Sequence, residues 1–179
     1  MGGTSLALQL NHRNSIDIDL FTQSDFDDNA IIEVLQKNYK TEEVFRRKNT
    51  IITLLDNVKT DFIKHDYPLI NAPITEEGIT YLGKEDIAAM KLHAIIQSGK
   101  RLKDFIDIYF LLQYFTMDQL IAFFVKKYSY SNSLIALKAV TYFDDIDENI
   151  DPPKLLQPLP LAVIKKRILP AAQKPHITF

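Results

Sequence analysis

The chain has 179 residues, a formal net charge of −2 and no cysteine, and 46% of its residues are hydrophobic. This length suits one domain, or one core domain with a helical extension. The lack of cysteine excludes disulfides, thiolate catalysis and cysteine-based zinc sites, and the net charge argues against a protein that coats nucleic acid broadly. No run reaches the ~20 apolar residues that span a membrane and no signal peptide is evident, so we expect a soluble, cytoplasmic protein.

The first third of the sequence alternates between helical and extended patterns. Its predicted helices cover residues 4–11, capped by Thr4 or Ser5, and residues 24–37, capped by Ser24 or Asp25. Its predicted strands cover residues 15–21, 43–47, 50–55 and 58–64. Short polar breaks separate the last three strands, and such breaks predict an antiparallel meander.

Beyond a loop at residues 66–83, the pattern becomes helical. Thr116 and Gln119 have the spacing of a capping box, which predicts that a helix begins there. The other predicted helices cover residues 84–97, 101–115 and 131–143, with a short one near 161–169. Six of the eight prolines fall in the last thirty residues, so we expect this tail to wrap the body.

These patterns predict an α+β fold, with a small mixed sheet in the N-terminal third followed by a C-terminal helical bundle. Three parts are expected: a core at residues 1–82, a helical bundle packed on it at residues 83–145, and a proline-rich extension at residues 146–179.

Two aspartates, Asp17 and Asp19, lie one residue apart in a β-patterned run. Because strand side chains alternate, Ile16, Ile18 and Leu20 share one face, which we expect to enter a core, and the aspartates share the other. Like charges side by side repel each other, and a bound cation between them relieves this repulsion. The alternative is a solvated outer face of an edge strand.

The segment Gly2-Gly3-Thr4 comes directly before the first predicted helix. Glycines let the backbone approach a ligand closely, and the free N–H groups at a helix start attract anions. A turn at the terminus is the competing interpretation. The position of Asp17 and Asp19 just downstream favours a nucleoside triphosphate held by backbone amides, which would meet Mg²⁺ held by the two carboxylates.

A two-metal site commonly needs a third carboxylate, and Asp61 suits this role because the predicted meander can bring it beside the strand that carries Asp17 and Asp19. The alternative for Asp61 is an exposed strand aspartate. Lys91 lies on the apolar stripe of a predicted helix, so its amine either reaches solvent at the edge or meets an anion such as a triphosphate.

Two further aspartates lie early in the predicted helix 101–115. We interpret Asp104 as a partner of the helix N-terminal dipole. Asp107 lies deeper in the helix beside apolar residues, and we expect it to form an ion pair with Lys91 or Arg101.

Ordered motifs within roughly residues 2–143 resemble the AbiEii/AbiGii-type nucleotidyltransferase toxins of the polymerase-β-like nucleotidyltransferase superfamily. The motifs are Gly2–Leu8 with His12-Arg13 and Ser15–Phe21, then Val58–Phe62, Ile87–Leu92 and Lys103–Leu112. The family has an apolar strand before its Gly-Gly turn, whereas this sequence begins at Met1. We therefore expect that the first strand of the family sheet is missing.

The resemblance implies a Mg²⁺-dependent enzyme that transfers a nucleoside monophosphate from an NTP to an acceptor, such as an RNA like tRNA. It also implies a toxin of a toxin–antitoxin or phage-defence system, with a cognate antitoxin protein as partner. The implied metal ligands, for two Mg²⁺ ions, are Asp17, Asp19 and Asp61. The implied nucleotide-binding residues are Gly2, Gly3, Thr4, Ser5 and Lys91. Asp107 is implied to orient Lys91 or to contribute directly.

Three alternatives remain open at this point. The first is a catalytically inactive, truncated relative that acts as a protein-interaction module through an exposed sheet edge. The second is a glycosyltransferase that uses the two aspartates for a nucleotide-sugar donor, although such an enzyme needs a larger domain and has no reason to keep Gly2-Gly3-Thr4. The third is a haloacid-dehalogenase-type phosphatase, but Leu20 and Phe21 lack the hydroxyl its motif needs.

Overall fold

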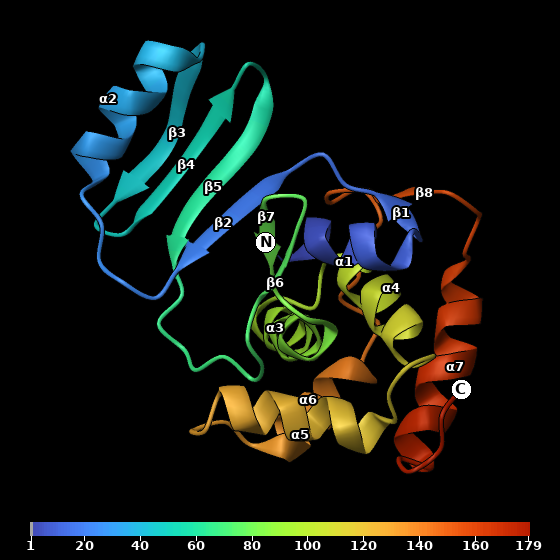
Figure 1. Cartoon of the computed structure of the whole chain (residues 1–179). Coiled ribbons are helices and arrows are strands. Elements are labelled where there is room, and N and C mark those ends of the chain that lie inside the picture. Colours follow the sequence, from blue (N-terminus) through green and yellow to red (C-terminus); the bar gives the residue numbers. More distant parts are fainter. Residues whose placement is uncertain (1) are drawn as a thin grey trace.

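The computed structural model describes residues 2–179 and has the expected mixed α+β architecture (Figure 1). Its helices are α1 (Gly3–Leu10), α2 (Asp28–Asn38), α3 (Lys84–Gln97), α4 (Leu102–Leu111), α5 (Met117–Lys127), α6 (Ser133–Val140) and α7 (Leu161–Gln173). Its strands are β1 (Arg13–Asn14), β2 (Ile18–Thr22), β3 (Thr41–Arg47), β4 (Thr50–Leu55), β5 (Val58–Lys64), β6 (Ile74–Glu76), β7 (Ile79–Tyr81) and β8 (Lys154–Leu155). Within residues 2–179, no helix combines the length and apolarity needed to cross a bilayer.

The main sheet has the strand order β2-β5-β4-β3. Strands β3, β4 and β5 form the predicted antiparallel meander, and Asn49, Asp56 and Asn57 adopt the left-handed conformation at its two turns. Strand β2 pairs in parallel with β5, so that Asp19 lies opposite Asp61. The expectation that the meander brings Asp61 beside the aspartate strand is therefore confirmed.

The hydrophobic face of β2 is less buried than the sequence predicts. Helix α2 lies along β3 and β4, where Ile32, Leu35 and Ile51 form a small core. Strand β2 lies at the opposite edge of the sheet, so Ile18 and Leu20 remain 37% and 40% exposed. Ile16 precedes the strand and is 65% exposed. The expectation that these three residues enter a core is wrong, because α2 does not extend over the edge strand.

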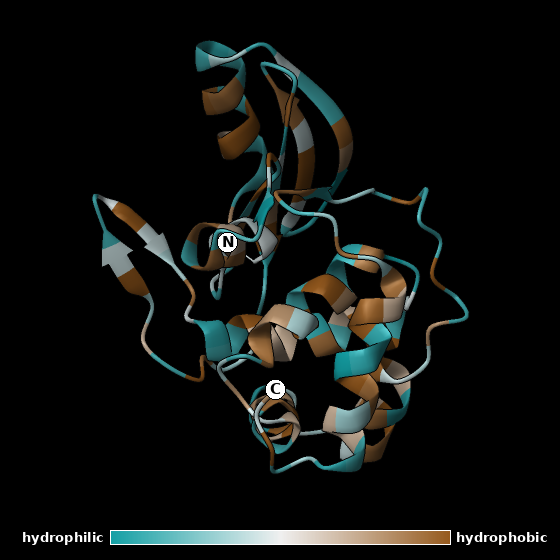
Figure 2. Cartoon of the chain, turned by 90° about the vertical axis from the view of Figure 1, so that its right-hand side faces the viewer, coloured by the Kyte–Doolittle hydropathy of each residue, from teal (hydrophilic) through white to brown (hydrophobic). Residues whose placement is uncertain are grey.

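The larger core lies among the helices, separate from the core under α2 (Figure 2). Helix α3 is at its centre and contacts α4, α5 and α6. Leu6 of α1 and Ile164 and Ile168 of α7 are completely buried in this core. Both ends of the chain thus contribute to the helical body, and the expected division at residues 82 and 145 stays a prediction.

Several helix boundaries differ from the predicted ones for local reasons. Asp27, rather than Ser24 or Asp25, caps α2 by accepting hydrogen bonds from the next backbone amides. Helix α1 has Gly2 at its N-cap and no side-chain cap, so the expected capping by Thr4 or Ser5 is wrong. The capping box at the start of α5 is confirmed.

Some short elements were not predicted. The loop at 66–83 contains the hairpin β6–β7, whose turn places Glu77 and Gly78 at positive φ. Strand β8 in the C-terminal extension pairs with β1, next to the segment that carries Asp17. Helix α7 continues past the expected end and includes Pro170.

A fully buried ion pair fixes the chain between β5 and α3. The Nζ atom of Lys127 lies 2.8 Å from Oδ1 of Asp86 and donates to the carbonyl of Pro68, and both charged side chains are 0% exposed. Asp86 also accepts the backbone amides of Ile70 and Asn71. One ion pair therefore holds this connection to both α3 and α5.

Replacing Lys127 by Met should lower the free energy of unfolding by about 3–5 kcal/mol, because the Asp86 carboxylate stays buried without its cation. The matched control is Lys126→Met, since Lys126 is exposed and makes one long hydrogen bond to a carbonyl. Urea denaturation of both variants measures the difference. Equal stabilities would contradict the assigned role of the pair.

Candidate active site

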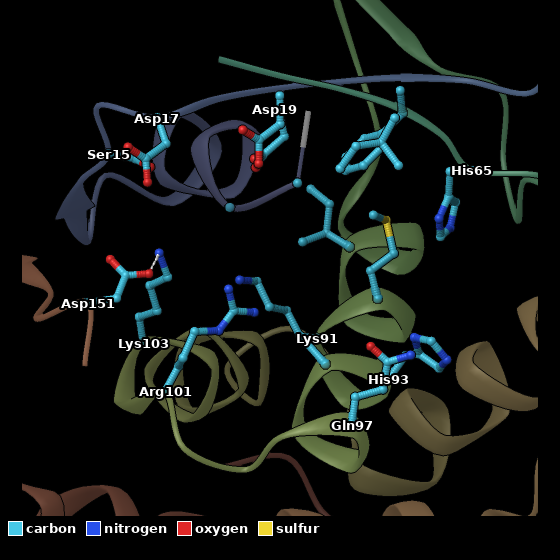
Figure 3. A pocket seen from close by; sticks show the side chains of 18 of the residues that line it. Ser15, Asp17, Asp19, His65, Lys91, His93, Gln97, Arg101, Lys103 and Asp151 are labelled. Atoms are coloured by element: carbon cyan, nitrogen blue, oxygen red, sulfur yellow. Dashed lines mark ion pairs between the residues drawn. The ribbon is translucent and has the colours of Figure 1, made fainter. Parts of the chain in front are cut away.

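A cavity of about 740 Å³ lies between the main sheet and the helical body (Figure 3). The sheet side presents Asp17, Asp19 and Asp61, and the helical side presents Lys91 and other cationic residues. The sheet wall thus carries three carboxylates, with Lys59 beside one of them, and the opposite wall carries most of the cations.

The three carboxylates come from adjacent positions in space. Asp19 and Asp61 are register partners on β2 and β5, and Asp17 lies in the segment just before β2. All three line the same cavity, which confirms that Asp17 and Asp19 point to one side. Asp61 is buried rather than exposed, so the alternative of an exposed strand aspartate is wrong.

The two carboxylate oxygens of Asp61 have different surroundings. Its Oδ2 atom lies 2.6 Å from Nζ of Lys59, whereas its Oδ1 atom is buried without a hydrogen-bond partner in residues 2–179. A buried acceptor without a partner is costly and marks a place where a ligand can bind. In the structure, the Lys59 ammonium neutralises the charge that a metal ion could otherwise balance.

The donor set fits a hard divalent cation. Magnesium prefers carboxylate oxygens, and Asp17, Asp19 and Asp61 supply these from β2, the segment just before it and β5, with one oxygen unpartnered. In the part of the chain that the structure describes, no three such side chains are already arranged to hold a metal ion. The three carboxylates are therefore candidate ligands that are not yet assembled around a common ion position.

The glycine turn at the start of α1 is close to the basic wall. A Cβ atom on Gly3 would lie 2.8 Å from Nη2 of Arg13 and 3.5 Å from Nζ of Lys91, so a larger residue here would displace the end of the Arg13 side chain. Gly2 and Gly3 line the cavity, whereas Thr4 and Ser5 do not. The backbone of the turn, rather than these two side chains, faces the space where a ligand can bind.

The side chains of Thr4 and Ser5 have other partners. The Thr4 hydroxyl donates to the carbonyl of Asp17 and lies 2.9 Å from the Ser15 hydroxyl. The Ser5 hydroxyl is buried and donates to the carbonyl of Leu82. These bonds tie α1 to the segment before β2 and to the chain before α3, so both residues position the turn. Their predicted role as phosphate ligands stays a prediction.

The Asp107 carboxylate, which is 0% exposed, is the centre of a buried charge network. It accepts hydrogen bonds from His12 Nε2 at 2.8 Å and Arg13 Nε at 2.9 Å, and it lies 2.8 Å from Nζ of Lys91. Burial opposes ionisation of this group, but the Lys91 charge and the two hydrogen bonds outweigh it and hold the pKa of Asp107 well below its ordinary value. The expected pair between Asp107 and Lys91 is confirmed.

Asp104 belongs to the same network. Its carboxylate is buried and binds Lys91 Nζ at 2.7 Å and Arg101 Nε at 2.9 Å. Asp104 does lie in the first turn of α4, as its interpretation as a partner of the helix dipole requires, but its ion pairs with Lys91 and Arg101 were not predicted. Burial lowers the pKa of Lys91, but the charges of Asp107 and Asp104 outweigh burial and raise it. Lys91 is buried, so its amine does not reach solvent at the edge.

Several residues of the cavity were not identified from the sequence. Arg13 was noted within a motif, but its bonds to Asp107 and to the carbonyl of Gly3 could not be foreseen. Lys103 and Asp151 form an ion pair at the cavity wall, where the C-terminal extension meets α4. For Lys103 the sequence signals were its place in a motif and the clustering of basic side chains at 100–103, and for Asp151 there was none.

In comparison with known proteins, residues 1–176 of the chain match a family of nucleotidyl transferases. The chain belongs to the AbiEii toxin family, which is described as the nucleotidyl transferase AbiEii toxin of type IV toxin–antitoxin systems. It is also 36% identical over 155 residues to an uncharacterized protein of Aquifex aeolicus (strain VF5), and this similarity covers 83% of this chain and 75% of that protein. No solved structure matches the chain significantly.

The pKa of Asp107 predicts how stability depends on pH. Because its folded-state pKa lies below the unfolded value near 4, the stabilisation is present above about pH 4 and is lost as pH falls further. Asp107→Asn should therefore lower the free energy of unfolding by about 3–5 kcal/mol at pH 7. Between about pH 5 and pH 3, the free energy of unfolding of this variant should fall by less than that of the parent chain. Urea denaturation across this range measures both effects, and parallel pH curves would contradict the assignment.

Proposed function

We propose that this protein is a Mg²⁺-dependent nucleotidyltransferase that transfers a nucleoside monophosphate from an NTP to an RNA acceptor such as a tRNA. The observation that supports this best is the pairing of Asp19 with Asp61 on parallel neighbouring strands, in a cavity that Asp17 and the glycine turn also line. Membership of a nucleotidyl transferase toxin family supports the same reaction class.

Asp17, Asp19 and Asp61 are the residues that would hold two Mg²⁺ ions. Bound metal ions of this kind stabilise the attacking and leaving oxygens of an in-line displacement. The unpartnered Oδ1 of Asp61 supports its role as a ligand, and Lys59 would then release the other oxygen.

The basic wall would bind the triphosphate. Lys91, Arg13 and Arg101 carry three permanent positive charges, and Asp104 and Asp107 carry two negative charges, which leaves an excess of one positive charge beside the cavity. The backbone amides at the start of α1 add further anion-binding groups. Asp104 and Asp107 fix these cations in place, because each cation forms an ion pair with at least one of the two carboxylates.

In the proposed reaction, an acceptor hydroxyl oxygen forms a bond to the α-phosphorus of the NTP. The bond from this phosphorus to the bridging oxygen breaks, and pyrophosphate leaves with that electron pair while the hydroxyl proton passes to solvent. This chain contributes positioning and charge stabilisation, which are the main sources of catalysis in phosphoryl transfer.

The family assignment also supports a biological setting. A type IV toxin–antitoxin system implies a cognate antitoxin protein as a partner, and NTP and RNA substrates imply action in the cytoplasm. We propose both for this chain, together with a role as the toxin of such a system or in phage defence.

A second candidate function rests on the free edge of the sheet. Strand β2 has no partner on its outer side within residues 2–179, and Ile18 and Leu20 are exposed there. An unpaired edge of this kind can accept a strand from another chain. An inactive relative that acts as an interaction module would bind partners through β2 and would not bind Mg-NTP.

Asp61→Asn should reduce NTP-dependent labelling of RNA roughly 100-fold or more, because it removes the charge of one metal ligand and keeps the side-chain shape. The assay incubates the protein with each labelled NTP, Mg²⁺ and total RNA. Asp66→Asn is the matched control, since Asp66 is exposed, lies outside the cavity and pairs with Lys64 at the surface. Labelling that persists in Asp61→Asn would contradict the proposal.

A further inference from the structure

The cavity has two chemically different halves (Figure 3). One half contains the carboxylates and the cations described above. The other half contains uncharged side chains that come from the ends of β2 and β5 and from α3. These uncharged residues include Phe21, His65, Tyr67, Met90, His93 and Gln97.

The cavity lining changes from charged to uncharged side chains along β2 and β5. Phe21 follows Asp19 by two residues and Ile63 follows Asp61 by two residues, so each lies on the cavity face about 7 Å beyond its aspartate. His65 continues the same direction at the end of β5. A ligand that extends along β2 and β5 therefore passes from charged to uncharged surroundings.

Helix α3 shows the same division across its cavity face. Lys91 points toward Arg101 and the carboxylates, whereas His93 and Gln97 lie on the other side of the view in Figure 3. The His93 ring is stacked on Tyr128 with 4.2 Å between the ring centroids and an angle of 12° between the planes. Gln97 is exposed at the end of α3 and lines the cavity, so its amide is accessible to a ligand there.

Both histidines of this half are neutral at physiological pH. Burial, together with the nearby Lys127 charge, lowers the pKa of His65 to about 4. Burial alone also lowers the pKa of His93. A neutral imidazole offers one hydrogen-bond donor and one acceptor, and the Gln97 amide offers both kinds of group as well.

We propose that this neutral half binds the nucleobase of the incoming NTP, and that Gln97 and His93 contact the base and determine which NTP is preferred. The inference rests on the proposed function and goes beyond it by assigning specificity to named residues. A planar group with polar edges and no formal charge matches a surface of rings, neutral donors and neutral acceptors. A phosphate does not match it, because none of the described residues that line this half is cationic.

Isothermal titration of the full chain in Mg²⁺, without RNA, tests the inference. The probes are ATP, GTP, CTP, UTP and inorganic tripolyphosphate, which has the phosphates without a base. We expect one NTP to bind the parent chain more tightly than tripolyphosphate. In Gln97→Ala the affinity for this NTP should fall roughly fivefold while the affinity for tripolyphosphate stays unchanged, as for the loss of about one hydrogen bond.

Two more variants complete the design. His93→Phe keeps a ring against Tyr128 but removes the ring nitrogens, and it should change the order of preference among the four NTPs. Gln36→Ala on α2 is the matched control, because Gln36 is exposed on a helix that does not line the cavity. It should leave every affinity unchanged.

The possible failures are distinguishable. If tripolyphosphate binds as tightly as every NTP, or if Gln97→Ala and His93→Phe bind NTPs like the parent chain, the base-binding inference is overturned and the phosphate-binding site stands. If the parent chain binds neither NTP nor tripolyphosphate, the proposed function is overturned together with the inference.

Discussion

The interaction on which the site depends is the burial of Asp107 among His12, Arg13 and Lys91. A carboxylate removed from water is tolerated only when its counter-charges and hydrogen-bond donors are buried with it. These donors come from the segment after α1 and from α3, while Asp107 belongs to α4. One charge therefore fixes three parts of the chain relative to each other. Because Arg13 also binds the carbonyl of Gly3, the same charge sets the position of the glycine turn.

Much of the fold could be predicted because it depends on local pattern. The helix at 84–97 and the strands at 50–55 and 58–64 agree with the structure at both ends. Alternation showed which side chains of β2 share a face, but whether that face is covered depends on where α2 packs, which no local pattern contains. The hairpin β6–β7 escaped prediction because its strands have three residues each and lie in a segment that Pro68, Pro73 and Gly78 interrupt.

The site could be predicted only in part. The carboxylates were found because an aspartate pair in a strand is costly and because the meander restricts where Asp61 can lie. The ion pairs of Asp104 were missed because a helix dipole and a buried cation favour the same residue type in the first turn. The neutral half of the cavity gave no sequence signal, since His65 and His93 lie 28 residues apart and meet only in the folded chain. The partners of Asp104 and the neutral half of the cavity depend on how the helices and strands pack, which the local sequence does not contain.

The parallel pairing of β2 with β5 has a consequence for when the site can form. About forty residues separate the two strands, and Lys91 and Asp107 follow much later in the sequence. Helix α7, which ends at Gln173, supplies buried side chains to the same core as α3 and α4. During synthesis, the carboxylates and the cations therefore meet late, and the core behind them closes only after residues 161–173 have left the ribosome. An incomplete chain carries the acidic half of the cavity without a fully supported basic half.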